Sequence, residues 1–191
     1  MFARRLHAFA ADTRGASLVE LALMLPFMLT LVMGVIDLGR AIQFNNILAN
    51  MSREGANLAA RSSEDPQFII TALSTTAAPL EMATSGMIYI TWITGVKLDP
   101  TCVTGCTIQT RVTAQSRAVS GDGTLASRVY TCPSWGGGGA CNVPSSQPLV
   151  AISMPLKDGE QVRIVEVSYH YTPMAGYVMV GTQTLYADTI L

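Results

Sequence analysis

The feature that most constrains this chain is an apolar run near its N-terminus. Residues 21–36 are 16 consecutive residues without a charge, bounded by Glu20 and Asp37. A helix of that length covers about 24 Å, and apolar shoulders extend it to about 18–38, which approaches the ~30 Å of a bilayer core. The run therefore predicts either a membrane span or the core of a signal peptide.

The flanks of the run separate these two readings. A signal peptide carries small residues at a cleavage site after its apolar core, whereas here Asp37-Leu-Gly-Arg-Ala41 follows. Small residues come before the run, at Gly15-Ala16, behind a leader with three arginines and one aspartate. We therefore rank secretion after ordinary signal cleavage last. The positive leader predicts a cytoplasmic N-terminus and a C-terminal part outside the membrane.

Glu20 stands at the edge of the apolar run. An ionisable group at that place is costly unless it is paired, so it is a candidate functional residue. The alternative is that Glu20 lies among lipid headgroups and has no role.

These residues resemble a known family. A basic leader, Gly15, Glu20 five positions later and then an apolar helix resemble the prepilins of type IV-like pili. More narrowly, Arg14–Pro26, Gly34–Ala41 and Arg53–Arg61 resemble TadE-like minor pilins of tight-adherence pilus systems. This resemblance covers residues 13–61, and residues 161–191 resemble the family's closing strands more loosely. The chain departs from the family at Leu21, where Phe or Tyr is usual.

The resemblance implies a processing site and subunit contacts. A prepilin peptidase would cleave after Gly15 and leave a free amine on Ala16. The Glu20 carboxylate could then pair with the amine of a neighbouring subunit, which would set register more than stability. By the same resemblance, the residues expected to contact other subunits also include Pro26, where the helix should bend, and Asp37, Arg53 and Glu54.

The function implied is that of a minor pilin that primes or caps a pilus and supports adhesion. Its partners would be a major pilin, a second minor pilin, the prepilin peptidase, the inner-membrane assembly platform and membrane lipid. It would lie in a bacterial inner membrane with a periplasmic C-terminal domain, and in an extracellular pilus after assembly. The alternative is an uncleaved, single-pass anchored binding module.

Other function classes find little support in the sequence. Catalytic motifs such as a nucleophile elbow, a paired-histidine helix or a dinucleotide-binding glycine pattern do not occur. The basic residues are scattered, so we expect no nucleic-acid partner. We expect neither an enzyme nor a cofactor or metal. Glu166 and His170 are about 13 Å apart along a predicted strand, a spacing that suits a solvated sheet face.

Four cysteines lie in the part predicted to be exported, where an even count favours disulfides. Of three possible pairings we favour the local ones, Cys102 with Cys106 and Cys132 with Cys141. The competing interpretation is a four-cysteine zinc site, but intervals of three and eight residues fit zinc knuckles poorly.

The patterning predicts an α+β fold. We expect a leader over 1–15, a long helix over 16–61 and an exported α+β domain over 62–191, in which a meander of antiparallel strands lies on the distal half of that helix. The expected elements are a second helix from Pro66 to about Pro79, a linker over 81–86, strands over 87–95, 107–114, 161–171 and 184–190, and a short strand over 125–130. Residues 131–149 should form a disulfide-tied lobe with Trp135 at its tip.

Overall fold

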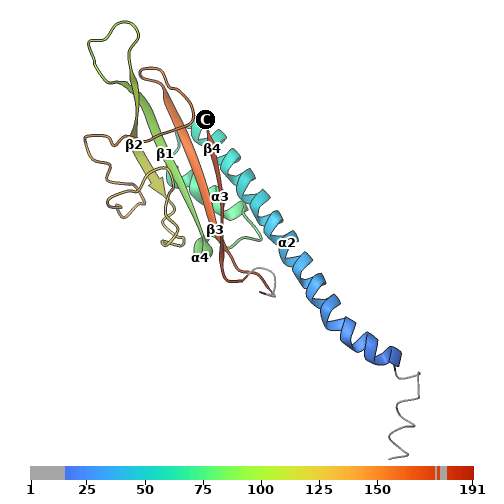
Figure 1. Ribbon diagram of the computed structural model, residues 1–191. Helices are drawn as coiled ribbons and strands as arrows, with labels where there is room; N and C mark the ends of the chain where they lie inside the picture. The colour runs from blue at the N-terminus through green and yellow to red at the C-terminus, as the bar shows by residue number, and fades with distance from the viewer. Residues whose placement is uncertain (1–15, 175, 177–179) are drawn as a thin grey trace, which may run out of the picture. The chain divides into compact units, whose positions relative to one another are not determined.

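We describe the fold from a computed structural model, in which residues 16–174, 176 and 180–191 are placed. They form helices α2 (Ala16–Arg61), α3 (Pro66–Thr76) and α4 (Met82–Ser85), and strands β1 (Gly86–Lys97), β2 (Ile108–Arg117), β3 (Gln161–Tyr171) and β4 (Gln183–Ile190) (Figure 1). The chain forms two compact units. One holds α2 up to Ala41 and the described residues of 172–181, and the other holds residues 42–171 and 182–191.

The long helix is continuous, as the sequence predicts. α2 runs through 46 residues and includes Pro26. The hydroxyl of Thr30, one turn after the proline, donates to the carbonyl of Pro26 at 2.8 Å. Leucine, alanine and methionine dominate this part of the chain and are strong helix formers, which favours helix on both sides of the proline.

The four strands form one antiparallel sheet in the order β2-β1-β3-β4. The predicted meander is therefore wrong, because β3 returns beside β1 and not beside β2. The physical reason is that residues 139–150 already bond to the free edge of β2, as in the bridges Ser116–Ala140 and Arg111–Leu149. The disulfide Cys102–Cys106 lies in the loop that joins β1 to β2.

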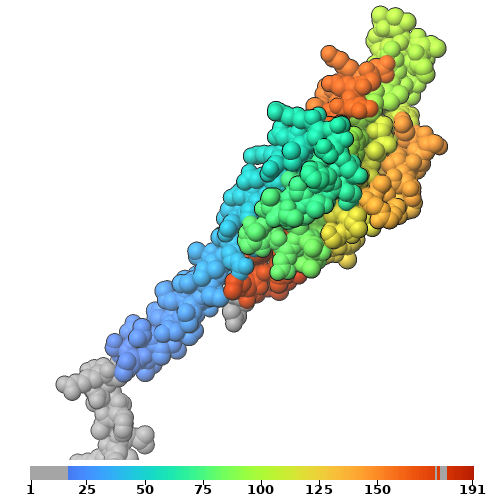
Figure 2. Space-filling view, turned by 180° about the vertical axis from the view of Figure 1, so that it is seen from behind, coloured from blue at the N-terminus to red at the C-terminus, as the bar shows by residue number. Residues whose placement is uncertain are grey.

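Helices cover one face of this sheet. Phe44 of α2 packs edge-on against Tyr169 and Tyr171 of β3, with ring centroids 5.8 and 5.4 Å apart. Each such aromatic pair contributes about 0.5–1.5 kcal/mol beyond simple burial. α3 begins at an Asp65 cap that accepts from the backbone N–H of Gln67, and α3 lies beside residues 42–61 of α2 (Figure 2).

An irregular segment, residues 118–160, covers the other face. It contributes Leu156 to a cluster with Ile93, Val162 and Ile164 of the sheet. Residues 125–130 belong to this segment and form no strand, contrary to prediction, and the expected linker contains the short helix α4. The unit formed by residues 42–171 and 182–191 is thus a three-layer α+β structure in which β1 and β3 are buried on both faces.

Candidate functional site

The first half of α2 presents apolar side chains on all sides. An 18-residue window of this helix has a mean hydropathy of 2.2, and none of that window is buried inside the structure. In water this surface would be strongly unfavourable, so it needs lipid or other helices around it. By length and composition the helix can cross a membrane. The exposed large side chains are Leu18, Val19, Leu21, Leu23, Met24, Leu25, Phe27, Met28, Leu29, Leu31, Val32, Val35, Ile36 and Leu38.

Glu20 lies within this apolar surface. Its side chain is exposed, and among the described residues no cationic side chain lies within 4.0 Å of it. Ala16 is the first residue of α2, and Gly15 lies outside the described residues. A carboxylate within an apolar surface is costly unless it is paired or reaches the lipid headgroups, and the described part of the chain supplies no partner for it.

Asp37, at the other end of the apolar run, is engaged within its own chain. Its side chain is 1% exposed, and Oδ1 accepts from the backbone N–H of Met174 at 2.9 Å. A charged acceptor makes a strong hydrogen bond. Asp37 therefore fastens the segment around residue 174 to α2, which sequence reasoning had not foreseen.

The residues of the Arg53-Glu54-Gly55 stretch differ in burial. Arg53 and Glu54 are exposed and available to a partner. Gly55 is buried, and a Cβ on it would lie 2.7 Å from Leu73 Cδ1 and 3.0 Å from Val165 Cγ1. Gly55 therefore lets α2 approach α3 and β3 closely.

Glu166 is fully buried, so the predicted solvated face is wrong. Its Oε1 accepts from the backbone N–H of Arg128 at 2.7 Å and from the hydroxyl of Tyr186 at 2.9 Å, while its Oε2 accepts from the hydroxyl of Ser127. Burial raises the pKa of the Tyr186 hydroxyl well above its usual range, and the Glu166 charge raises it further. Glu166 thus fixes the irregular segment to the sheet.

A second polar contact supports the same layer. His170 Nδ1 lies 2.8 Å from Asp122 Oδ2, so β3 also holds the start of the irregular segment. The pKa of Asp122 is lowered, chiefly by hydrogen bonds from Thr124. Within the described residues no group of three or more His, Cys, Asp or Glu side chains is placed to hold a metal ion.

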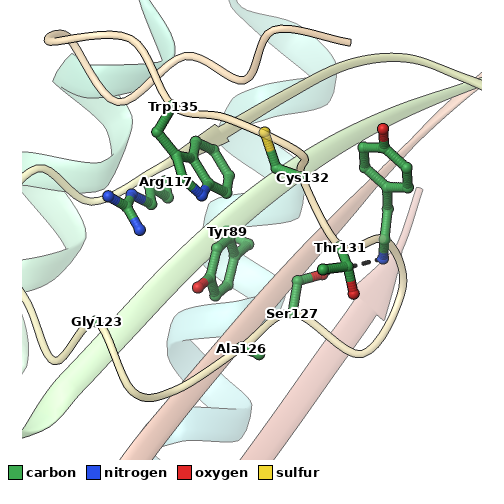
Figure 3. A pocket seen from close by; sticks show the side chains of 9 residues that line it. Tyr89, Arg117, Gly123, Ala126, Ser127, Thr131, Cys132 and Trp135 are labelled. Atoms are coloured by element: carbon green, nitrogen blue, oxygen red, sulfur yellow. Dashed lines mark hydrogen bonds between the residues drawn. The ribbon is translucent and has the colours of Figure 1, made fainter. Parts of the chain in front are cut away.

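A cavity of about 110 Å³ lies beside Tyr89 on this face (Figure 3). The Trp135 ring is 5.9 Å from that of Tyr89, and the Arg117 guanidinium lies 4.6 Å over the Trp135 ring. Trp135 therefore packs against the sheet, and its predicted place at the tip of a lobe is wrong. The Tyr89 hydroxyl donates to the carbonyl of Leu125 at 2.6 Å, and Ser127 donates to Glu166, so both hydroxyls are committed to the fold.

The second disulfide closes the loop that carries Trp135. Cys132 pairs with Cys141, and both disulfides follow the local pairing expected from the sequence. Within the same loop Gly139 has a φ of +75° and is buried. A Cβ there would lie 2.4 Å from the carbonyl oxygen of Arg117. One member of the four-glycine run is therefore required by close packing and by its backbone conformation.

Comparison with known proteins assigns the N-terminal region. Residues 15–57 match the family model described as "TadE-like protein". The chain carries a TadE-like N-terminal segment. Neither the curated proteins nor the solved structures give a match to the chain. The TadE-like segment contains Ala16, Glu20, Pro26, Asp37, Arg53 and Glu54, and it starts at the predicted processing site. Its apolar helix fits a membrane anchor, and the family match is consistent with a protein of the Tad pilus system.

Proposed function

We propose that this protein is a minor pilin of a tight-adherence pilus, processed after Gly15 and held in the inner membrane by α2 until it is assembled. The observation that carries the proposal is the exposed apolar surface of α2 around Glu20, within a segment that matches the TadE-like family from residue 15. Such a helix is suited first to lipid and then to a bundle of similar helices, since both surround it with apolar groups.

Glu20 has a specific place in this proposal. After cleavage the amine of Ala16 would be a cation at the end of one helix, and Glu20 of a neighbouring subunit would be its partner. A buried carboxylate without a partner costs several kcal/mol, so pairing would reject subunits placed in the wrong register. The role proposed is to prime or cap the pilus, with the domain formed by residues 62–191 on the outer side of the membrane and then on the pilus.

The decisive test is the N-terminal residue and the intact mass of the protein from membranes and from sheared surface material. We expect a chain that starts at Ala16, with both disulfides closed, in both fractions. A chain that starts at Met1 and occurs only in membranes would contradict the proposal and favour an uncleaved anchored binding module.

A pair of substitutions tests the role of Glu20. We expect Glu20→Ala to leave cleavage intact but to reduce the protein in sheared pili by about tenfold or more, the equivalent of about 1.4 kcal/mol. Glu64→Ala is the matched control, because Glu64 is also an exposed glutamate but lies outside α2 and its apolar run. Normal assembly of Glu20→Ala would remove Glu20 from the mechanism.

A further inference from the structure

The two edges of the sheet differ in how far the rest of the chain covers them. At the β2 edge, residues 139–150 make four backbone hydrogen bonds to β2. These are Arg117 N to Gly139 O, Cys141 N to Gln115 O, Val112 N to Pro148 O and Val150 N to Thr110 O, at 2.8, 2.8, 2.9 and 3.0 Å. This edge is therefore covered by the protein's own chain, a common way to prevent strands of other proteins from adding there.

Within the described part of the chain, the β4 edge is not covered by any other segment. Arg163 and Leu191 exchange both backbone hydrogen bonds, at 2.7 and 3.0 Å, which fixes the alternation along β3 and β4. Because the register is continuous from Ile164–Ile190 to Tyr171–Gln183, every second residue of β4 directs its N–H and C=O away from β3. Among the described residues these outward backbone groups have no hydrogen-bond partner. The outward row consists of Thr184, Tyr186, Asp188 and Ile190.

The usual protections of an edge strand are also missing from β4. Its sequence contains neither proline nor lysine, and its register with β3 has no bulge. Its one charge is Asp188, which is exposed, and in the described part of the chain no cationic side chain lies within 4.0 Å of its carboxylate. An edge of this kind favours the addition of a strand, and its charge favours a cation on that strand.

We propose that the β4 edge binds an extended segment of a partner pilus subunit, which adds as a fifth strand and places a lysine or arginine beside Asp188. This inference rests on the proposed function, and it adds the surface through which the folded domain meets its neighbour. Backbone hydrogen bonds to the outward row supply affinity, and the pairing with Asp188 selects the partner and its register.

A second copy of this chain fits the edge less well. Three contacts locate α2 along β4. Phe44 packs on Tyr171, which pairs with Gln183 at the start of β4. Further along, the hydroxyls of Ser52 and Thr189 are 2.9 Å apart, and Arg163, beside the end of β4, donates to the carbonyl of Ala59. Residues 42–61 of α2 therefore run in the same direction as β4. Two β4 edges paired by a two-fold axis are antiparallel, so these residues would run in opposite directions in the two copies. Copies anchored in one membrane in one orientation do not meet in that way.

The test uses the full chain in cells that assemble pili. A photo-reactive benzophenone side chain is placed at Thr184 on the β4 edge or, as the matched control, at the exposed Ala114 on the covered β2 edge. After irradiation the cross-linked peptides are identified by mass spectrometry. We expect Thr184 to join an extended, Lys- or Arg-containing segment of another pilus subunit, and Ala114 to give at least about tenfold less product.

Two variants test the chemistry of the pairing. Asp188→Pro removes an outward N–H and keeps the hydrogen bonds to β3, while Asp188→Lys reverses the charge. We expect each to lower the Thr184 cross-link by about tenfold or more without loss of the protease-resistant domain. If Asp188→Pro does not fold, Asp188→Lys carries the test.

Several outcomes would overturn the inference. These are equal cross-linking at Thr184 and Ala114, unchanged yields in both variants, or a Thr184 product that joins two copies of this chain. The N-terminal residue is read from the same preparations. A chain that starts at Ala16 and reaches pili with no Thr184 product removes the edge contact alone, whereas a Met1 start removes the proposed function.

Discussion

At the scale of single residues, two carboxylates illustrate what sequence patterns can and cannot reveal. Glu20 and Asp37 bound the same apolar run, and both were expected to contact other subunits. The structure leaves Glu20 exposed, whereas Asp37 is 1% exposed and bonded to the backbone of Met174. The partner of Asp37 lies 137 positions away along the chain. Spacing within the helix carries no information about such a distant contact.

Glu166 gives a similar lesson on the sheet. It alternates with valines as a residue on a solvated face would, but a segment without regular structure covers that face. The covering contacts are largely backbone N–H groups of residues 128 and 129, and almost any residue type could supply them. The composition of residues 118–160 therefore gave no sign of this layer.

The tyrosine beside Glu166 yields a prediction about alkaline stability. The pKa of Tyr186 is raised by burial and by Glu166, so the folded state holds its proton more tightly than the unfolded state does. The free energy of unfolding is then unaffected below pH ~10 and falls as the pH rises above it, by at most about 1.4 kcal/mol per pH unit for this proton. Urea unfolding in mild detergent at several pH values measures this slope.

Tyr186→Phe tests the origin of that slope, because it removes the ionisable hydroxyl. We expect the variant to be less stable at neutral pH, since Glu166 loses one donor, but to lose less stability between neutral and alkaline pH. Tyr130→Phe is the control, as no hydrogen bond joins the Tyr130 ring hydroxyl to Glu166. An alkaline slope in Tyr186→Phe equal to that of the unmodified protein would contradict the assignment.

At the scale of elements, the packing of α2 on α3 and β3 depends on Gly55. We expect Gly55→Val to destabilise the domain by about 1–3 kcal/mol, because its side chain would overlap Leu73 and Val165. The shift of the urea midpoint measures this effect. Gly123→Val is the control, because a Cβ at Gly123 meets no atom within 4 Å. Equal stability of both variants would show that the helix moves aside without cost.

The elements themselves were largely predictable, but their order in the sheet was not. The continuous helix over 16–61 and the four main strands follow from apolar periodicity and β-branched content, which are local signals. The position of β3 beside β1 depends on which edge of β2 is already occupied by residues 139–150. The binding of residues 139–150 to this edge depends on backbone hydrogen bonds and on Gly139, and neither can be predicted from a hydrophobic pattern.

At the scale of the whole molecule, the exposed apolar half of α2 governs how the protein can be handled. We expect the full chain to stay in the membrane pellet after a high-salt wash and to be released by mild detergent, because salt weakens ionic contacts but not apolar burial. Immunoblots of the fractions measure the distribution. Release by salt alone would mean that α2 does not enter the bilayer.

The order of the strands also dictates when the domain can take shape. β1 is a central strand of the sheet, yet one of its two neighbours, β3, begins only at Gln161. Glu166, which bonds to residues 127–129, belongs to this late strand. Loop closure over such separations precedes any gain from pairing. In the proposed export the chain after α2 emerges in sequence order, so β1, β2 and the irregular segment lack these partners until about the last thirty residues have emerged. On that proposal, emergence of β3 is the step after which the sheet can close.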